Sequence, residues 1–435
     1  MKKIMAIFIL LLMFTPMIFQ IFGYKRGELK GYYDKTAKPT LTLRNFSELE
    51  FQNKVEKYIK DDIAFSDFLI RLSNEIRYRI FNYSNTQYVI IGKNNYLYME
   101  SYLNSYYGLD YQGDEKIFKA VRKLAQVRDS LNVRGVDIVF MIAPGKVTYY
   151  PEYLPSKYKN LKKGKTNYQT FSNAFNKYNI NYLDFNRWIC SMKDTISYRL
   201  YSNTGVHWGQ YASYLAVDSL IKYLDYKYDV SLPQIKIKSI KESRVISKSD
   251  DDVEQIMNLV SNIPDEKMPR LKIQIDSSNK DNLRVLSMGD SYFFGLNEFG
   301  LMNRIFYDSE FWYYFKEVRS SKVNYFLVNE YDDLKKEIEK NKLILIVFTE
   351  GNLHTTPFEF CNELYSLYCE NNSYSKELAW QKKRYKIQID KDKNWRESVK
   401  NKAKKLNITY EKALDNDAEY MAKEFLSQKD FVSEK

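Results

Sequence analysis

Helical and strand patterns alternate across the middle of the chain. Apolar residues at helical spacing, such as Ile117, Val121, Leu124 and Leu131, are followed by short apolar runs of strand length. The helical segments lie at 115–131, 167–178, 212–220 and 331–340, and the strand segments lie at 133–142, 180–185, 283–289, 322–328 and 342–348. This alternation predicts an α/β fold with a mostly parallel sheet that helices cover on both faces.

The pattern changes at both ends and once in between. Residues 4–22 form an uncharged run of 19 residues, long enough to span a bilayer, and no small-x-small cleavage site follows it. We therefore expect 1–24 to be an uncleaved membrane anchor and everything after it to lie outside. We also expect a helical lead-in over 25–85 that packs on the next domain, an α/β domain over 86–375 with an insertion at 229–280, and a basic helical tail over 376–435.

Composition narrows the range of partners. Lys and Arg outnumber Asp and Glu by 67 to 55, and the net charge of +12 favours attraction to anionic lipid head groups or to an acidic polymer. No nucleic-acid-binding motif is present, so we expect no nucleic acid partner. The basic run in the tail is more often a solvated face than a binding surface.

The strand at 283–289 runs straight into a Gly-Asp-Ser turn. The carboxyl ends of strands in a parallel sheet are where α/β proteins hold their sites. A serine on a tight turn there has an exposed hydroxyl, and Gly289 lets the backbone come close enough for amide groups to face a developing oxyanion. Ser291 is therefore the candidate nucleophile, although three small polar residues after a strand more often form an ordinary turn.

The chain has only two histidines, so the choice of an imidazole base is narrow. His207 precedes a helix that starts near residue 209, and His354 follows the strand at 342–348. Imidazole is the side chain suited to take and return a proton near neutral pH. Two histidines without carboxylates that we can place do not make a zinc site, so we expect no metal and no cofactor.

Four motifs in a fixed order carry a family resemblance. They are Ala-Pro-Gly-Lys-Val-Thr-Tyr-Tyr-Pro-Glu-Tyr-Leu-Pro at 143–155, His207-Trp208, Gly289-Asp290-Ser291-Tyr292, and Thr-Glu-Gly-Asn-Leu at 349–353. With these motifs the chain, from about residue 45 to 370, resembles the AlgX/AlgJ-type alginate O-acetyltransferase family and its DHHW relatives. The resemblance implies an SGNH-hydrolase-like, flavodoxin-type sandwich in a permuted order, with the histidine before the serine.

The resemblance also implies roles for single residues. Ser291 matches the nucleophile of the family and His207 matches its base. We expect Gly289 and Asp290 to support the turn, with Asp290 bracing it. The Ser291 backbone amide, together with the side chain of Asn352, is expected to receive the oxyanion.

One position departs from the family pattern. The family has an aspartate two residues before the histidine, and this chain has Gly205 there. Three outcomes are open. A carboxylate from elsewhere replaces the aspartate, with Glu350 and Asp184 near strand ends as candidates; a backbone carbonyl orients a Ser–His dyad; or the domain is catalytically dead.

The family acts outside the cytoplasm, transfers acetyl groups to hydroxyls of secreted polysaccharides, and is usually served by a membrane-bound O-acyltransferase. The resemblance therefore implies an O-acetyltransferase that works through an acyl-serine, anchored by a single pass in the inner membrane and facing the periplasm. The alternatives are a carbohydrate acetylesterase and a non-catalytic carbohydrate-binding or assembly protein that kept the fold and lost the aspartate.

Overall fold

The computed structural model describes most of the chain from residue 49 onward. The described residues are 3–5, 14–16, 18–19, 21–22, 27–31, 38–40, 49–62, 66–244, 249–264, 266–278, 281, 283–319, 326–328, 331, 333–370 and 373–433. Most of the anchor expected over 1–24 lies outside them. Among the described residues, no helix combines the length and the apolar character that crossing a membrane requires.

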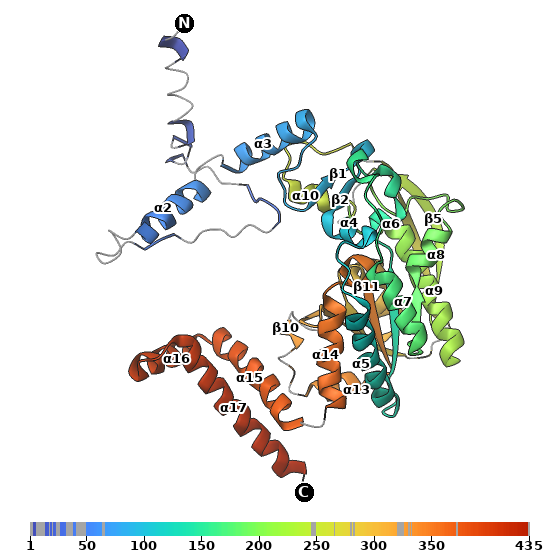
Figure 1. Cartoon of the computed structure of the whole chain (residues 1–435), viewed down its shortest axis with the longest axis vertical. Helices are drawn as coiled ribbons and strands as arrows, with labels where there is room; N and C mark the ends of the chain where they lie inside the picture. Colours follow the sequence, from blue (N-terminus) through green and yellow to red (C-terminus); the bar gives the residue numbers. More distant parts are fainter. Residues whose placement is uncertain are drawn as a thin grey trace.

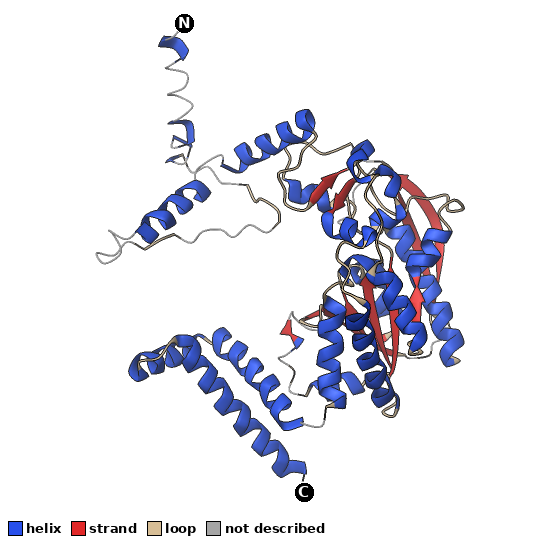
Figure 2. Cartoon of the chain, in the orientation of Figure 1, coloured by secondary structure: helices blue, strands red, loops and turns tan. Residues whose placement is uncertain are grey.

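A seven-stranded sheet forms the centre of the described structure (Figure 1; Figure 2). Its strand order is β10-β9-β8-β7-β11-β3-β4. The strands from β8 to β4 run parallel, while β9 and β10 pair antiparallel at one edge. The sheet is therefore mixed and mostly parallel, as the alternation predicts. The strand bounds are β3 Asp137–Ala143, β4 Tyr182–Asp184, β7 Arg284–Gly289, β8 Tyr307–Tyr313, β9 Glu317–Arg319, β10 Phe326–Leu327 and β11 Leu343–Thr349.

Helices cover both faces of this sheet, because alternate residues of each central strand point to opposite sides. Phe140 and Ile142 of β3 belong to one core, whereas Met141 and Ala143 belong to the other. The helices of the first core are α5 (Asp114–Asn132), α7 (Asn167–Lys177), α13 (Leu334–Glu339) and α14 (Thr356–Cys369). Those of the second core are α4 (Glu100–Tyr107), α6 (Lys146–Tyr149), α8 (Phe185–Ser191), α9 (Gln210–Tyr228), α11 (Phe293–Leu296) and α12 (Leu301–Ile305).

The insertion expected at 229–280 folds as a two-stranded hairpin with a short helix between its strands. Strand β5 (Gln234–Ser243) pairs antiparallel with β6 (Met268–Asp276), and α10 (Asp252–Met257) lies between them in sequence. A second hairpin, β1 (Val89–Ile91) with β2 (Leu97–Met99), lies beside α10 in Figure 1. The insertion therefore has a defined structure at one end of the sheet domain.

Several strands of the sheet differ from the sequence prediction. The strand predicted over 133–142 begins only at Asp137, because Gly135, with a φ of 77°, turns the chain between helix and strand. Of the strand predicted over 322–328, only β10 lies within the described residues, since 320–325 lie outside them. The hydrophobic pattern does not predict β8, in which Asp, Ser and Glu are mixed with aromatic residues.

Both ends of the chain are helical, as expected. The lead-in contains α2 (Leu49–Asp62) and α3 (Ser66–Phe81), and the tail contains α15 (Ser373–Lys391), α16 (Lys393–Leu406) and α17 (Tyr410–Ser433). Helix α3 contacts the domain through Tyr78, which is buried in the core, while Phe68, Ile76 and Ile80 are 45%, 43% and 70% exposed. Polar side chains of α3 make further contacts with the domain. The tail has a small core of its own and stands away from the sheet in Figure 1.

Candidate active site

The turn that carries Ser291 follows the central strand β7 at the carboxyl edge of the sheet. Its entry requires glycine, because Gly289 has a φ of 155° and a Cβ there would lie 1.9 Å from the carbonyl oxygen of Val347 in the neighbouring strand β11. The backbone amide of Ser291 makes no hydrogen bond with the described residues. The turn therefore presents both the hydroxyl and an amide donor at the edge where α/β proteins hold their sites.

Asp290 braces this turn, as expected from the sequence. The carboxylate is fully buried and accepts hydrogen bonds from the backbone amides of Tyr292 (2.9 Å) and Thr349 (2.8 Å). It also accepts one from the side-chain amide of Asn352 (2.8 Å). Burial raises the pKa of Asp290, while these hydrogen bonds act in the opposite direction. Asp290 therefore joins the end of β7 to the end of β11, and Asn352 contacts the turn through it.

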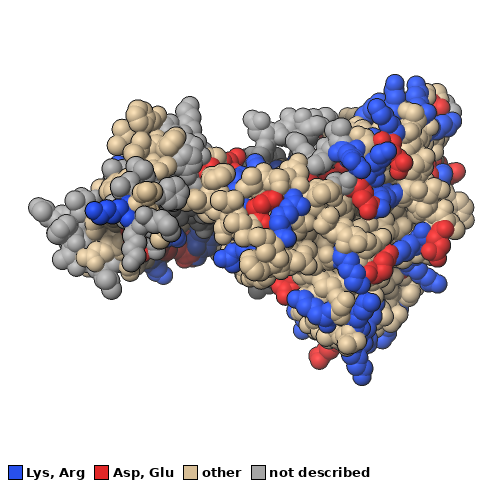
Figure 3. Space-filling view, turned by 90° about the horizontal axis from the view of Figure 1, so that it is seen from above, with Lys and Arg blue, Asp and Glu red and all other residues tan. Residues whose placement is uncertain are grey.

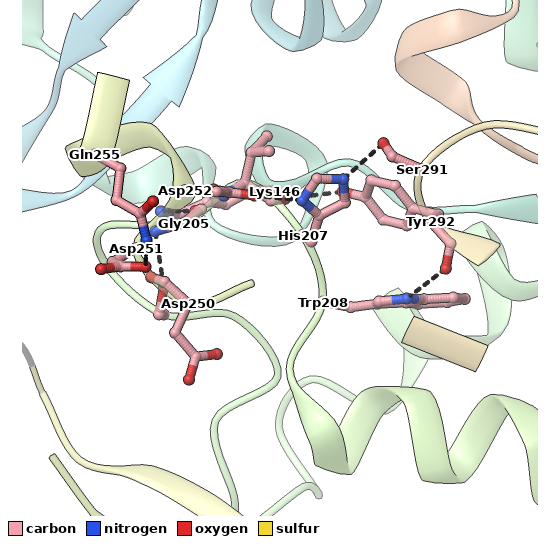
Figure 4. Close-up of polar contacts among 12 residues, drawn as sticks. Lys146, Gly205, His207, Trp208, Asp250, Asp251, Asp252, Gln255, Ser291 and Tyr292 are labelled. Atoms are coloured by element: carbon pink, nitrogen blue, oxygen red, sulfur yellow. Dashed lines mark hydrogen bonds and ion pairs between the residues drawn. The ribbon is translucent and has the colours of Figure 1, made fainter. Parts of the chain in front are cut away.

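His207 lies in the loop just before α9, with its ring facing Ser291. Its Nε2 lies 2.7 Å from the Ser291 Oγ, and Figure 4 marks this contact with a dashed line. The neighbouring residues hold the two loops together: the indole of the buried Trp208 donates to the Tyr292 carbonyl (3.1 Å), and the Tyr292 hydroxyl donates to the Val206 carbonyl (2.9 Å). The His-Trp and Ser-Tyr dipeptides of the two motifs are thus bonded to each other directly.

A carboxylate from the insertion orients the histidine. Asp252, the first residue of α10, lies within hydrogen-bond distance of His207 Nδ1 through its Oδ2, and its Oδ1 accepts the Val206 backbone amide at 2.8 Å (Figure 4). Burial of the imidazole lowers its pKa, but the hydrogen bond and the charge of Asp252, with a smaller contribution from Asp290, outweigh this and raise the pKa of His207 above its ordinary value. The two nitrogens of one ring therefore join a carboxylate to a serine hydroxyl.

The sequence candidates for the orienting carboxylate were wrong. Glu350 is buried and accepts from the Gly145 amide (2.8 Å) and the Asn186 side chain (2.6 Å), so it holds the turn after β3. Asp184 caps α8 by accepting from the Arg187 amide at 2.9 Å. Both carboxylates are engaged by these local donors, and the carboxylate bonded to His207 belongs to Asp252.

Gly205 explains why the carboxylate comes from elsewhere. A Cβ at residue 205 would lie 2.4 Å from the Ser249 carbonyl oxygen and 2.7 Å from the Asp250 carbonyl carbon. The backbone of the insertion therefore fills the space that any side chain at this position would need. The only sequence signal for the replacement is the Ser-Asp-Asp-Asp run at 249–252, inside a segment rich in Lys, Ser and Asp.

The second histidine has a different environment. His354 Nδ1 lies 3.0 Å from the Gly351 carbonyl oxygen and 3.5 Å from a carboxylate oxygen of Asp110. It follows β11, as predicted, and lies away from the Ser291–His207 contact in its hydrogen bonding, since its ring contacts Gly351 and Asp110. The structure thus places Ser291, His207 and Asp252 in hydrogen-bonded sequence at the carboxyl edge of the parallel part of the sheet, an arrangement that can support nucleophilic catalysis by the serine.

Comparison with known proteins shows a similarity to one family. The sequence model of the SGNH hydrolase-like domain of acetyltransferase AlgX matches residues 89–284. This range includes His207 and Asp252 and ends before Ser291. Over these residues, a little under half of the chain, the sequence is similar to the AlgX/AlgJ-type family. No curated protein matches the chain.

Three solved structures are similar to the chain at low sequence identity. The O-acetyltransferase domain of Pseudomonas putida AlgJ is 14% identical, with a TM-score of 0.39, and the match covers 64% of this chain and 98% of that one. Pseudomonas aeruginosa AlgX is 13% identical (TM-score 0.42; 63% and 70% covered). Bacillus cereus PatB1 with a sulfonyl adduct is 12% identical (TM-score 0.42; 62% and 99% covered). The similarity to the AlgX family therefore rests on the match of the sequence model and not on these structures.

Proposed function

We propose that this protein is an O-acetyltransferase that moves acetyl groups to hydroxyls of a polysaccharide through an acyl-serine intermediate. The observation that carries the proposal is the contact of 2.7 Å between His207 Nε2 and Ser291 Oγ, with Asp252 on the other ring nitrogen. His207 and Asp252 lie in the segment that matches the AlgX-type acetyltransferase model. Nothing in the chain distinguishes an alginate-like acceptor from another secreted glycan, so the acceptor is proposed as a class.

The first half of the reaction forms the acyl-enzyme. His207 Nε2 takes the proton of the Ser291 hydroxyl as the oxygen attacks the carbonyl carbon of an acetyl donor. The Ser291 backbone amide is the proposed donor to the oxyanion, because it has no hydrogen bond with the described residues. The bond to the leaving group then breaks, and the imidazolium returns its proton to that group.

The second half transfers the acetyl group to the sugar. A sugar hydroxyl gives its proton to His207 Nε2 while its oxygen attacks the acetyl carbon, and the Ser291 oxygen leaves with that proton. Asp252 keeps the imidazole in the tautomer that has a free Nε2 lone pair and stabilises the imidazolium. An esterase would use water as the acceptor in this step, so transferase and esterase differ only in what reaches the acyl-enzyme.

The location and the supply of acetyl groups are part of the same proposal. The uncharged run at 4–22 supports an anchor in the inner membrane with the domain in the periplasm. A protein at that place needs an acetyl donor from across the membrane, which a membrane-bound O-acyltransferase partner would supply.

The alternative of a non-catalytic binding protein loses its main argument. That alternative rests on an imidazole left without an orienting carboxylate at Gly205, and Asp252 occupies the hydrogen-bonding position.

Acetylation of the intact protein tests the proposal. The full chain is incubated with p-nitrophenyl acetate and its intact mass is measured beside the Ser291→Ala variant and a matched control, Ser191→Ala, in which an exposed serine at the end of α8 is removed. We expect one added acetyl group in the wild type and in Ser191→Ala, and none in Ser291→Ala. Equal labelling of Ser291→Ala, or a folded wild type that takes no acetyl group, would contradict the proposal.

A further inference from the structure

The catalytic carboxylate sits on a segment that has little structure of its own. Helix α10, which begins at Asp252, is only six residues long. On the side of His207, the segment is tied to the preceding loop: the Thr204 hydroxyl donates to the Asp250 carbonyl (3.0 Å), and the Glu254 amide donates to the Thr204 carbonyl (3.2 Å). These bonds hold the amino-terminal end of α10. At the other end Met257 is buried in the core and the Thr86 hydroxyl donates to the Ile256 carbonyl (3.3 Å), and a neighbouring helix adds further support.

That support comes from the lead-in helix α3. The Asn74 side-chain amide donates to the carbonyl of Met257, the last residue of α10, at 2.8 Å. One Glu75 carboxylate oxygen accepts from the backbone amides of Val260 (3.1 Å) and Ser261 (3.3 Å), and the other accepts from the Ser261 hydroxyl (2.5 Å). The last carbonyls of a helix have no partner inside the helix, so a side chain that binds one of them fixes the position of that end. Figure 1 shows α3 beside α10.

The contact between α3 and this segment is polar in character. Leu69, Ile80 and Phe81 of α3 are 53%, 70% and 69% exposed, whereas Tyr78 is buried in the core. The hydrogen bonds of Asn74 and Glu75 therefore fix where the helix meets the segment together with those of Arg71 to the Leu259 carbonyl (3.2 Å) and of Arg79 to the Asn262 carbonyl (3.1 Å).

We propose that Asn74 and Glu75 are positioning residues for Asp252: they hold the carboxyl end of α10 and so keep the carboxylate at its amino end against His207. The inference rests on the proposed acyl transfer for its effect on rate, but its effect on the histidine is independent of any substrate. The lead-in thereby becomes part of the active-site support, although it lies more than 170 residues before Asp252 in sequence.

The two histidines of the chain make a direct test feasible. Protein labelled with nitrogen-15 in histidine gives signals from His207 and His354 only, and His354→Asn assigns them. The charged groups that face His207 are Asp252 and Asp290. Asp252→Asn removes the charge that is bonded to the imidazole, so it should give the largest fall in the pKa of His207 and is the reference for the other variants. The His354 signal is the internal reference in every spectrum.

The test variants are Asn74→Ala, Glu75→Ala and the double variant. We expect the pKa of His207 to fall in each variant, farthest in the double variant, while the His354 signal stays unchanged. We also expect the double variant to acetylate Ser291 with p-nitrophenyl acetate more slowly, on the order of tenfold, because a small misplacement of an orienting group is costly. A His207 titration identical to wild type in the double variant, while Asp252→Asn moves it, would overturn the inference.

Two controls separate positioning from charge and from loss of fold. Glu75→Gln removes the charge but keeps an oxygen acceptor, so His207 should titrate as in the wild type. If the pKa of His207 shifted as far as in Glu75→Ala, the charge alone would act and the inference would be wrong. Arg77→Ala changes an α3 residue whose side chain donates a hydrogen bond to Ser73 within the same helix, and should change neither readout. If the double variant does not fold, the single variants decide. If the wild type takes no acetyl group, the proposed function is wrong, but the titration of His207 still tests whether Asn74 and Glu75 position Asp252.

Discussion

At the scale of single residues, Gly205 and Asp252 together replace the one aspartate that the family pattern places two residues before the histidine. The absence of a side chain at 205 admits the backbone of residues 249 and 250, and this backbone brings Asp252 to the imidazole. Ser291 and His207 were predictable because each lies in a short local motif. Asp252 was not, because its contact with His207 spans 45 residues of sequence and its own surroundings resemble a solvated loop.

Replacing Asp252 with Asn tests the relay through its pH dependence. The base works when His207 is neutral, so the rate of acetyl transfer rises as pH increases through the pKa of His207. Asp252 raises that pKa, and Asp252→Asn should therefore lower the maximal rate, by on the order of 10³–10⁴-fold, and move the acidic limb of the profile to lower pH. The pH profile of kcat/KM for p-nitrophenyl acetate measures both effects. Asp251→Asn, which changes the adjacent carboxylate bonded to Gln255, is the matched control and should keep the wild-type profile.

Restoring the aspartate at position 205 should fail. In Gly205→Asp the new Cβ would meet backbone atoms of Ser249 and Asp250 at 2.4–2.7 Å, so the insertion must move and take Asp252 with it. We expect a loss of about 1–3 kcal/mol in the free energy of unfolding, measured with denaturant, together with slower acetylation. The double variant Gly205→Asp/Asp252→Asn should not recover activity. Recovery would show that the space at 205 can open.

The elements around the site were predicted unevenly. Strands β3, β7 and β11 are buried along nearly all of their length, and their continuous apolar runs identified them. Strand β8 pairs with β7 in the sheet, but its polar residues interrupt the hydrophobic pattern. The sequence of β8 alone therefore does not predict a strand, and its pairing with β7 is visible only in the structure. Helix α10 was not predicted, because it is only six residues long and its buried face consists of Val253, Glu254 and Met257 within a segment rich in Asp and Ser.

Lys146 joins several of these elements, and its replacement gives a prediction at this scale. The side chain is fully buried, and its ammonium group donates to the carbonyls of Leu97 in β2 (2.8 Å) and of Asn203 (2.8 Å) and Gly205 (2.7 Å) in the loop before His207. Lys146→Met leaves these carbonyls without that donor. We expect on the order of 1–3 kcal/mol less stability to denaturant and slower acetylation of Ser291.

The matched control for Lys146 is Lys165→Met, which removes an exposed lysine paired with Asp114. Exposed ion pairs contribute little, so this variant should keep both stability and rate. If Lys146→Met behaved like the control, the loop before His207 would be held by its other contacts.

At the scale of the whole molecule, the charge is more evenly distributed than the net value of +12 suggests. On the face in Figure 3, Lys and Arg lie interspersed with Asp and Glu. In the tail, Lys382 and Lys386 pair with Asp415, and Lys402 pairs with Asp417. These pairs join α15 and α16 to α17, so part of the basic run that the sequence displays serves to assemble the tail.

The placement of the aspartate has a consequence for how relatives of this chain are recognised. A motif search that requires an acidic residue two positions before the histidine would class this protein as a pseudoenzyme. The pairing of Gly205 with Asp252 supplies a second pattern for such searches: a glycine at the vacated position, followed by a carboxylate in an inserted segment whose backbone fills the vacated space. Homologues with this pair should be sorted with the enzymes, and homologues with the glycine but no such insertion with the pseudoenzymes.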